Sequence, residues 1–388
     1  MLYLIQNGAL SMASVIAGFV RSPFTRAGRG SLSKSRPDDI AAAVVNSLLT
    51  DLGVDPGTIE DIIVGTAFPE GEQGFNLARM ITFLTDLPES VPGVTINRFC
   101  GSSMQAIHDA AGRIAMGAGE AFIAGGVEGM SRIPMTGFNP MPNPKLSQSY
   151  PAAFTSMGIT AENLAAKHGI DRQAQEAFAA ASHAKAAKAT ESGAFSEEIV
   201  PIETSVGMVS SDGCIRPDTS TEVLSGLRPA FLTDGTVTAG TSSPLTDGAA
   251  FVLVCSEEFA KEQGLTPLAR IVSTAVSGCA PEIMGIGPVE ATRKALERAD
   301  LSIDEIDIIE LNEAFAAQSL AVIEELDLDP AKVNLDGGAI AIGHPLGASG
   351  ARITGKAAQL LHRNGAKRAL ATMCIGGGQG IATILEKP

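Results

Sequence analysis

Apolar residues recur with a helical period in the segment 35–53, which a serine and a proline open and Gly53 closes. The apolar positions lie four residues apart, at Ile40, Val44, Leu48 and Leu52. This spacing predicts an amphipathic helix. Short apolar runs at 13–20, 62–65, 94–96 and 121–124 predict strands, and 75–83 and 102–116 predict further helices. Such alternation indicates a parallel sheet covered by helices.

The same order of elements recurs near the C-terminus, with helices expected at 288–298 and 317–325 and strands at 308–309 and Val333. Asp307-Ile308-Ile309 repeats Asp61-Ile62-Ile63 after 246 positions, and Gly347 with Ser349 repeats Gly101 with Ser103 at the same distance. Two motifs in one register indicate the internal duplication of an α/β unit.

A long insertion interrupts the first half, because its expected last strand, 250–254, follows some 120 residues rich in Pro, Ser, Ala and helix formers. We therefore expect an N-terminal half at 12–126 plus 247–268, an inserted loop domain at 127–246, and a C-terminal half at 269–388. Met12 is taken as the start of the first half, and residues 1–11 are assigned no function.

Four polar or reactive side chains stand at corresponding turns of the two halves. In open α/β sheets, ligands bind beyond the carboxyl ends of the strands, so residues at matching strand ends are expected to converge. These residues are Cys100, Asn312, His344 and Cys374.

Cys100 stands between an expected strand and a helix that opens with Gly101-Ser102-Ser103. Its sulfur is expected at the positive end of a helix dipole, a setting that predicts a lowered pKa for the thiol. His344 occupies the matching turn of the second half, and an imidazole within hydrogen-bond distance activates a thiol. Taken singly, the two residues are also compatible with a structural cysteine and a polar loop histidine.

Cys374 ends an expected buried strand just before the run Gly376-Gly377-Gly378. Glycines let backbone N–H groups approach a ligand closely, so this turn is a candidate oxyanion site. Two cysteines and a histidine can also bind a metal, but the chain has no CxxC or HxxxH spacing, and no metal is expected. A cysteine protease would need neither a second cysteine nor a duplicated fold.

Composition excludes some function classes. The formal net charge of -15 and the pI near 4.8 argue against nucleic-acid binding, which needs a basic surface. Five widely spaced cysteines favour a reducing compartment over a disulfide framework. Residues 1–20 lack the basic start of a secretory signal, and the chain has no apolar run long enough for a membrane span. We expect a cytoplasmic protein.

Four long motifs together resemble the thiolase family, from about Ser14 to the C-terminus. The first surrounds Cys100 and resembles the nucleophile motif of thiolases, and the other three follow in family order. They are NRFCGSSMQA at 97–106, NEAFAAQ at 312–318, GGAIAIGHPLGASG at 337–350 and CIGGGQG at 374–380.

The resemblance implies an α/β fold of two duplicated βαβαβαββ halves that form a five-layered α-β-α-β-α sandwich, with two mixed five-stranded layers between the helices. It also implies a loop domain that covers coenzyme A over the active site. Carried over onto this sequence, the family's pantetheine channel would be lined by Met157, Ser243 and Phe315. Arg216 is a candidate contact for the nucleotide end of coenzyme A.

The resemblance further implies a mechanism without metal or redox cofactor, in which coenzyme A is a co-substrate. Cys100 is the expected nucleophile on a 3-oxoacyl-CoA, and Cys374 protonates the departing acetyl-CoA enolate and later deprotonates coenzyme A. His344 activates Cys100 and, with a water held by Asn312, stabilises the enolate. The N–H groups of Cys100 and Gly376 form a second oxyanion site. Homodimers or homotetramers are typical of the family, and a fatty-acid-oxidation multienzyme partner is possible.

Departures from the family pattern favour a degradative 3-ketoacyl-CoA thiolase. Biosynthetic acetoacetyl-CoA thiolases often carry His before the Met-Gly pair, where this chain has Ser156. Pro244 replaces a smaller residue of many relatives. The alternatives are a biosynthetic acetyl-CoA acetyltransferase, a decarboxylating condensing enzyme, and a non-catalytic lipid-binding or scaffold module. The thiol of Cys374 argues against the condensing enzyme, and the presence of all four reactive residues argues against the silent module.

Overall fold

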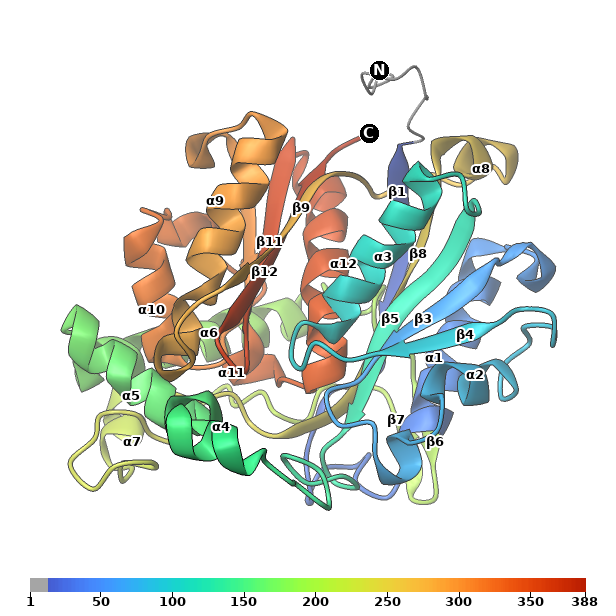
Figure 1. The fold of residues 1–388 in the computed structure, drawn as a ribbon. Helices are drawn as coiled ribbons and strands as arrows, with labels where there is room; N and C mark the ends of the chain where they lie inside the picture. Colours follow the sequence, from blue (N-terminus) through green and yellow to red (C-terminus); the bar gives the residue numbers. More distant parts are fainter. Residues whose placement is uncertain (1–12) are drawn as a thin grey trace.

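The computed structural model describes residues 13–388 (Figure 1). The expected start of the fold at Met12 and the preceding eleven residues lie outside this range. In the first half, five strands lie in the order β1-β8-β5-β3-β4, and the short strand β2 (Thr25–Arg26) also pairs with β8. These five strands are β1 (Ser14–Arg21), β3 (Asp61–Gly65), β4 (Gly93–Ile96), β5 (Ala121–Gly129) and β8 (Thr246–Ser256).

The second half repeats this succession as β9-β12-β11-β10, which agrees with the predicted duplication. Its strands are β9 (Ala269–Gly278), β10 (Ile308–Leu311), β11 (Arg368–Ile375) and β12 (Gln379–Glu386). The strand predicted at Val333 is wrong, because this residue forms only an isolated parallel bridge with Ile309.

The two half-sheets join edge to edge through β1 and β9. Val15 pairs with Arg270 and Ile16 with Ala269, so that the strands form one ten-stranded mixed sheet. The two strand layers implied by the resemblance are therefore the two halves of one continuous sheet. Sequence patterns within each half carry no information on pairing between two strands that lie some 250 positions apart.

Two helices fill the space between the half-sheets, as Figure 1 shows. The helices α3 (Ser102–Ala115) and α12 (Leu346–Asn364) pack on each other, and their apolar residues share one core cluster with strands of both halves. The outer face of the first half is covered by α1 (Pro37–Leu52) and α2 (Leu77–Thr82), and that of the second half by α9 (Gly287–Ala299) and α10 (Ala316–Glu325). This arrangement confirms the predicted α-β-α-β-α layers.

The predicted helical periodicity accounts for the packing of α1. Ile40, Val44 and Leu48 are all buried, and Gly53 ends the helix with a left-handed φ of 65°.

In α12, a glycine permits this helix to approach α3 closely. A Cβ added to Gly350 would lie 2.4 Å from the Met104 nitrogen of α3. The central helices can therefore be in near backbone contact only because Gly occupies this position.

The segment between β5 and β8 lies along one end of the molecule (green to yellow in Figure 1). It contains the helices α4 (Pro144–Ser149), α5 (Met157–His168), α6 (Arg172–Glu191) and α7 (Thr221–Ser225), and the hairpin β6 (Ile202–Thr204) and β7 (Gly207–Val209). Helix α5 packs on α10, and α6 packs on α11 (Ala339–Ile342). The division of the chain into domains at 127 and 246 stays a prediction.

A buried group of charges ties this segment to the sheet. The Arg21 guanidinium of β1 lies 2.7 Å from Glu198 and 2.7 Å from Asp212, and Lys356 of α12 donates to Glu198 at 2.7 Å. Removing one member would leave an unpaired buried charge, at a cost of about 3–5 kcal/mol. These ion pairs attach the inserted segment to β1 and α12.

Candidate active site

The turn that carries Cys100 lies between β4 and α3. Asn97 opens it, accepting the Phe99 N–H on Oδ1 at 2.8 Å and donating from Nδ2 to the Ala67 carbonyl at 2.9 Å. Phe99 has a φ of 45°, a left-handed conformation that costs energy for a non-glycine residue. The Asn97 side chain therefore holds a strained turn and attaches it to the segment after β3.

Cys100 and Cys374 come together, as the sequence predicts. A Cβ on Gly101 would lie 2.5 Å from Cδ1 of Ile375, so the Cys100 turn packs directly on the end of β11. The Gly376 N–H forms a hydrogen bond that lowers the pKa of the Cys100 thiol. After burial, the charge of Cys100 is the main influence that raises the pKa of Cys374. The structure thus places both sulfurs and the Gly376 N–H around one point.

The expected lowering of the Cys100 pKa is wrong. Burial raises the pKa of this thiol to about 11, the Gly376 N–H lowers it less, and the Glu128 carboxylate raises it further. Loss of hydration opposes the thiolate more strongly than the N–H groups of Gly376 and Cys100 favour it. The resting nucleophile is therefore a neutral thiol that requires a base.

The alkylation rate of Cys100 by iodoacetamide is expected to follow its thiolate fraction. Because the pKa is about 11, the rate should rise about tenfold per pH unit from pH 7 to pH 10 in the free enzyme. Mass spectrometry of the Cys100 peptide measures this rate. A plateau below pH 8 would contradict the raised pKa.

His344 is buried in the turn before α12, and hydrogen bonds hold both its backbone and its ring. Its N–H donates to Oγ1 of Thr246 at 3.0 Å, and its Nδ1 lies 2.6 Å from Oγ of Ser349. Ser349 donates to the Pro345 carbonyl at 3.0 Å. Its hydroxyl is therefore assigned as the acceptor of the Nδ1–H, which leaves Nε2 of His344 unprotonated.

Burial, with a smaller contribution from Arg352, lowers the pKa of His344 to about 3. The imidazole is therefore neutral throughout the physiological pH range, as a base must be. Its Nε2 lies 3.4 Å from Nδ2 of Asn312. This contact brings together two of the predicted residues from different motifs of the second half.

Asn312 follows β10 and is fully buried, yet its Oδ1 has no hydrogen-bond partner within residues 13–388. A buried acceptor without a partner is rare and indicates a place for a water or a ligand donor. No hydrogen bond joins the Cys100 sulfur to the His344 ring within the same range, although Cys100 packs against the apolar cluster that contains Leu346. The expected nucleophile–base pair therefore forms no direct hydrogen bond.

The four candidate coenzyme A contacts fall into two connected groups. Met157 and Phe315 belong to the same apolar cluster as Cys374. Ser243 and Arg216 line a cavity of about 460 Å³, which is also lined by Arg26. Phe231 lines this cavity too, and its ring packs edge-on against Phe315 at 5.9 Å. Side-chain packing therefore connects the lining of a cavity with two arginines to the cluster that contains Cys374.

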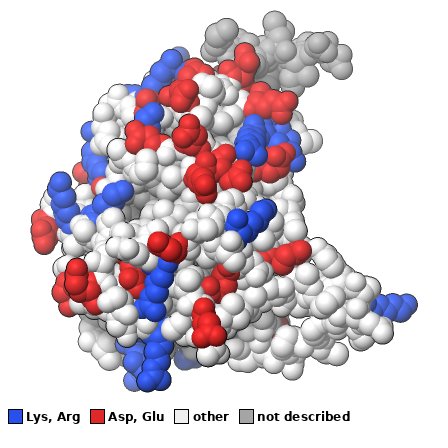
Figure 2. All heavy atoms as spheres, turned by 90° about the vertical axis from the view of Figure 1, so that its left-hand side faces the viewer, with Lys and Arg blue, Asp and Glu red and all other residues white. Residues whose placement is uncertain are grey.

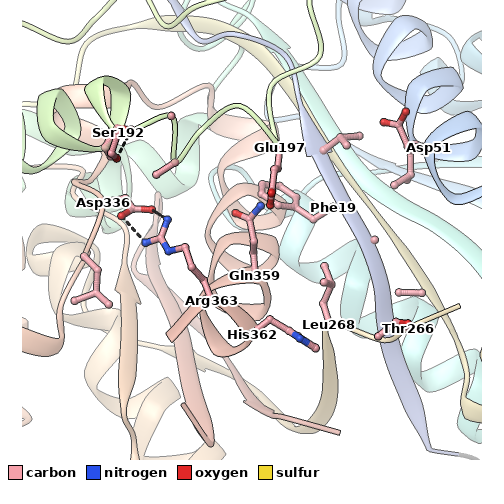
Figure 3. A pocket seen from close by; sticks show the side chains of 18 of the residues that line it. Phe19, Asp51, Ser192, Glu197, Thr266, Leu268, Asp336, Gln359, His362 and Arg363 are labelled. Carbon is pink, nitrogen blue, oxygen red and sulfur yellow. Dashed lines mark hydrogen bonds and ion pairs between the residues drawn. The ribbon is translucent and has the colours of Figure 1, made fainter. Parts of the chain in front are cut away.

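A larger cavity, of about 1070 Å³, lies elsewhere, between β1, the end of α6 and the end of α12 (Figure 3). It contains none of the predicted site residues. Arg363 points at Asp336 in Figure 3 and donates to it at 2.6 and 2.7 Å. Cavity size alone would therefore have directed attention away from the reactive residues.

Sequence reasoning missed Glu128, Ser349 and Arg26. Glu128 gave a usable signal, since it is a carboxylate in an otherwise apolar strand and is fully buried. Buried carboxylates require hydrogen-bond or charge partners, which often include functional groups. The positions of Ser349 and Arg26 depend on contacts between distant segments and left no local signal.

Comparison with known proteins identifies the family. A family described as thiolase, N-terminal domain, matches residues 14–258, and one described as thiolase, C-terminal domain, matches residues 265–387. The chain belongs to the thiolase family. This confirms the resemblance seen in the four motifs.

Individual relatives match over nearly the whole chain. A 3-ketoacyl-CoA thiolase of Aliivibrio fischeri is 51% identical over 384 residues, with 96% of this chain and 99% of the relative covered. One of Bacillus subtilis is 47% identical over 386 residues, with the same coverage. The crystal structure of human mitochondrial 3-ketoacyl-CoA thiolase in complex with CoA has a TM-score of 0.90 at 40% identity, covering 97% of this chain and 98% of that one. The Bacillus anthracis acetyl-CoA acetyltransferase has a TM-score of 0.89 at 42% identity, covering 97% and 99%.

Proposed function

We propose that this thiolase catalyses the coenzyme A-dependent cleavage of a 3-oxoacyl-CoA to acetyl-CoA and a shortened acyl-CoA, and the reverse Claisen condensation. The observation that carries the proposal is the meeting of two thiols, the partly buried Cys100 and the buried Cys374, with an N–H donor and with the turn that carries a neutral histidine. This set provides a nucleophile, an acid–base thiol and an imidazole base for one thioester.

In the first half-reaction, the Cys100 proton passes to Nε2 of His344 and the sulfur attacks the 3-keto carbon. The bond between C2 and C3 then breaks, and its electron pair goes to the thioester enolate of acetyl-CoA. The Cys374 thiol, whose pKa burial raises well above its ordinary value, is protonated at rest and gives its proton to the C2 carbanion. An acyl group remains on Cys100.

In the second half-reaction, the Cys374 thiolate takes the proton of coenzyme A, whose sulfur attacks the acyl carbon. The bond to Cys100 breaks, and the Cys100 thiolate recovers the proton from His344. Oxyanions form in both steps. The N–H groups of Cys100 and Gly376 are suited to the acyl oxyanion, and His344 with a water on the unpartnered Oδ1 of Asn312 is suited to the enolate.

Coenzyme A is proposed to enter through the cavity of about 460 Å³ described above. Arg216 and Arg26 there suit the phosphates of its nucleotide. Ser243, Met157 and Phe315 would then line the narrower path for pantetheine. The human relative was solved in complex with CoA and shares this fold, which supports the binding of coenzyme A.

Two substrate ranges are compatible with the family. The curated relatives named 3-ketoacyl-CoA thiolases at 47–51% identity and the absence of a histidine at Ser156 support a degradative enzyme. The structural match to an acetyl-CoA acetyltransferase keeps the biosynthetic alternative in consideration.

Thiolysis of acetoacetyl-CoA and of 3-oxooctanoyl-CoA is expected to proceed with kcat/KM values within about tenfold of each other, because adding methylenes to an apolar channel changes binding only modestly. The loss of the absorbance of the 3-oxoacyl thioester in its enolate form, which neither product has, measures both rates. Negligible turnover of the longer substrate would reject the degradative assignment and support the biosynthetic one.

We also propose that the chain forms a homodimer or homotetramer in the cytoplasm, with a fatty-acid-oxidation multienzyme as a possible partner. Strand β4 is an edge of the sheet and only half-buried, and Met80 and Phe83 beside it are exposed. An open edge with apolar neighbours is suited to pairing with a second copy. All five cysteines are free, which suits a reducing compartment.

A second exposed apolar region could serve the larger assembly. Met141, Leu146 and Phe154, around α4, are exposed, and the lower right of Figure 2, where this region projects, carries few charges. No helix within residues 13–388 is long and apolar enough to cross a bilayer.

A further inference from the structure

One carboxylate lies inside the apolar strand β5 and takes no part in the proposed chemistry. Glu128 is fully buried, and its two oxygens accept four hydrogen bonds. Oε2 accepts the backbone N–H groups of Ala67 and Gly347, each at 2.8 Å. Oε1 accepts Nε2 of Gln73 at 2.6 Å and Oγ1 of Thr66 at 3.2 Å.

The two N–H groups on Oε2 come from different halves of the protein. Ala67 follows β3 in the first half, and its carbonyl accepts the Asn97 side chain that holds the Cys100 turn. Gly347 is the second residue of α12 in the second half, three positions after His344. A hydrogen-bonded path therefore runs from the Cys100 turn through Glu128 to the His344 turn.

We propose that Glu128 is a positioning residue that sets the Cys100 turn at its working distance from His344 across the two halves. The proposal rests on the catalytic roles proposed above for these two residues. Since no hydrogen bond joins their side chains within residues 13–388, their spacing is fixed by the turns that carry them. Glu128 is the side chain that bonds to both supporting segments.

The chemistry of the site requires a carboxylate. Three of the four partners of Glu128 are N–H groups, which can only donate. A glutamine has nearly the same shape but only one acceptor oxygen, so its NH₂ group must face either a donating amide or two backbone N–H groups. Glu128→Gln keeps the volume but either breaks the connection to Ala67 and Gly347 or sets its NH₂ group against the Gln73 amide and displaces the side chain, and both arrangements leave buried donors without acceptors.

The same substitution has a separate electrostatic effect on Cys100. The groups that act on this thiol are the Glu128 carboxylate on β5, the Gly376 N–H after β11 and the backbone N–H of Cys100 itself, with the Cys374 thiol adjacent. Of these, Glu128 is the one that opposes the Cys100 thiolate by charge. Removing that charge should make the thiolate easier to form.

In Glu128→Gln, kcat for thiolysis of acetoacetyl-CoA is expected to fall about 100-fold, the order of loss for a displaced catalytic pair. The KM for coenzyme A should change less than about threefold, because the coenzyme A cavity is not touched. At the same time, the pH profile of Cys100 alkylation should move to lower pH. A slower enzyme with a more reactive nucleophile is a combination that general destabilisation does not produce.

Ser103→Ala is the matched control. Ser103 on α3 accepts the Ala351 N–H of α12 at 2.8 Å, which is another buried bond across the two halves but without charge. This variant should lower thermal stability, leave the alkylation profile in place and reduce kcat far less than Glu128→Gln does. If Glu128→Gln fails to fold by circular dichroism, Asn97→Ala breaks the same path at an exposed residue and should lower kcat at least tenfold with an unchanged KM for coenzyme A.

The proposal is overturned if Glu128→Gln folds and keeps kcat within about threefold of the unsubstituted enzyme. The proposal is also overturned if Glu128→Gln and Ser103→Ala lose kcat equally and the pH profile of Cys100 alkylation does not move in Glu128→Gln. If Asn97→Ala is used in place of Glu128→Gln, an unchanged kcat overturns it. Failure of the catalytic assignment itself is distinguishable, because Cys100→Ala would then remain active.

Discussion

Replacing Cys100 by alanine is expected to abolish thiolysis, with a loss in kcat on the order of 10⁴-fold or more, the scale seen when a covalent nucleophile is removed. The acyl group would have no sulfur to which it could transfer, and neither Cys374 nor His344 is placed to substitute for it. The decay of the 3-oxoacyl-CoA enolate absorbance measures the loss. Incubation with 3-oxoacyl-CoA should also leave no acyl adduct in the mass spectrum of the intact protein.

Cys255→Ala serves as the control, because it is expected to lose stability and to keep its activity, whereas Cys100→Ala should do the reverse. Cys255 is fully buried in β8, away from the site, so its removal creates a small cavity that costs about 1 kcal/mol while turnover persists. Cys100 lies in a partly exposed turn, so Cys100→Ala should show little change in the midpoint of thermal unfolding. An active Cys100→Ala enzyme would refute the assigned nucleophile.

Replacing Cys374 by alanine is expected to separate the two halves of the reaction. Attack by Cys100 remains possible, but no acid protonates the enolate and no base activates coenzyme A, so turnover should fall about 10³-fold, within the usual range for a general acid–base group. The acyl-Cys100 adduct should then accumulate. Rapid quenching followed by mass spectrometry detects it.

Cys279→Ala is the matched control for this variant, because its thiol is close enough to raise the pKa of Cys374 yet has no assigned step. It should turn over at a rate within about threefold of the unsubstituted enzyme. Equal losses in the two variants would indicate that packing, and not proton transfer, limits the Cys374→Ala enzyme.

Local patterns predicted the elements and the convergence of the reactive residues. The fourfold spacing around Ile40 predicted α1 within two residues of its observed ends, because burial of one helix face repeats with the helical period. The repeat of Gly101 in Gly347 placed Cys100 and His344 at equivalent turns, and both turns do lead into central helices.

Features that depend on burial or on distant pairing could not be predicted. The helix that follows Cys100 suggested a lowered thiol pKa, but the pKa is set mainly by loss of water, which is a property of the folded surroundings. The join of β1 to β9 and the single bridge at Val333 depend on how the two halves meet. The contacts of Glu128 also connect segments from three parts of the chain.

The central layer of α3 and α12 has a consequence for how the chain originated and unfolds. Each half contributes one of these helices, and each helix buries its apolar surface against the other half. An ancestral single unit would have exposed that surface and would have needed a twin molecule to cover it. Fusion made the pairing permanent, so a protease that cuts between β8 and β9 should yield fragments that stay associated until both denature together.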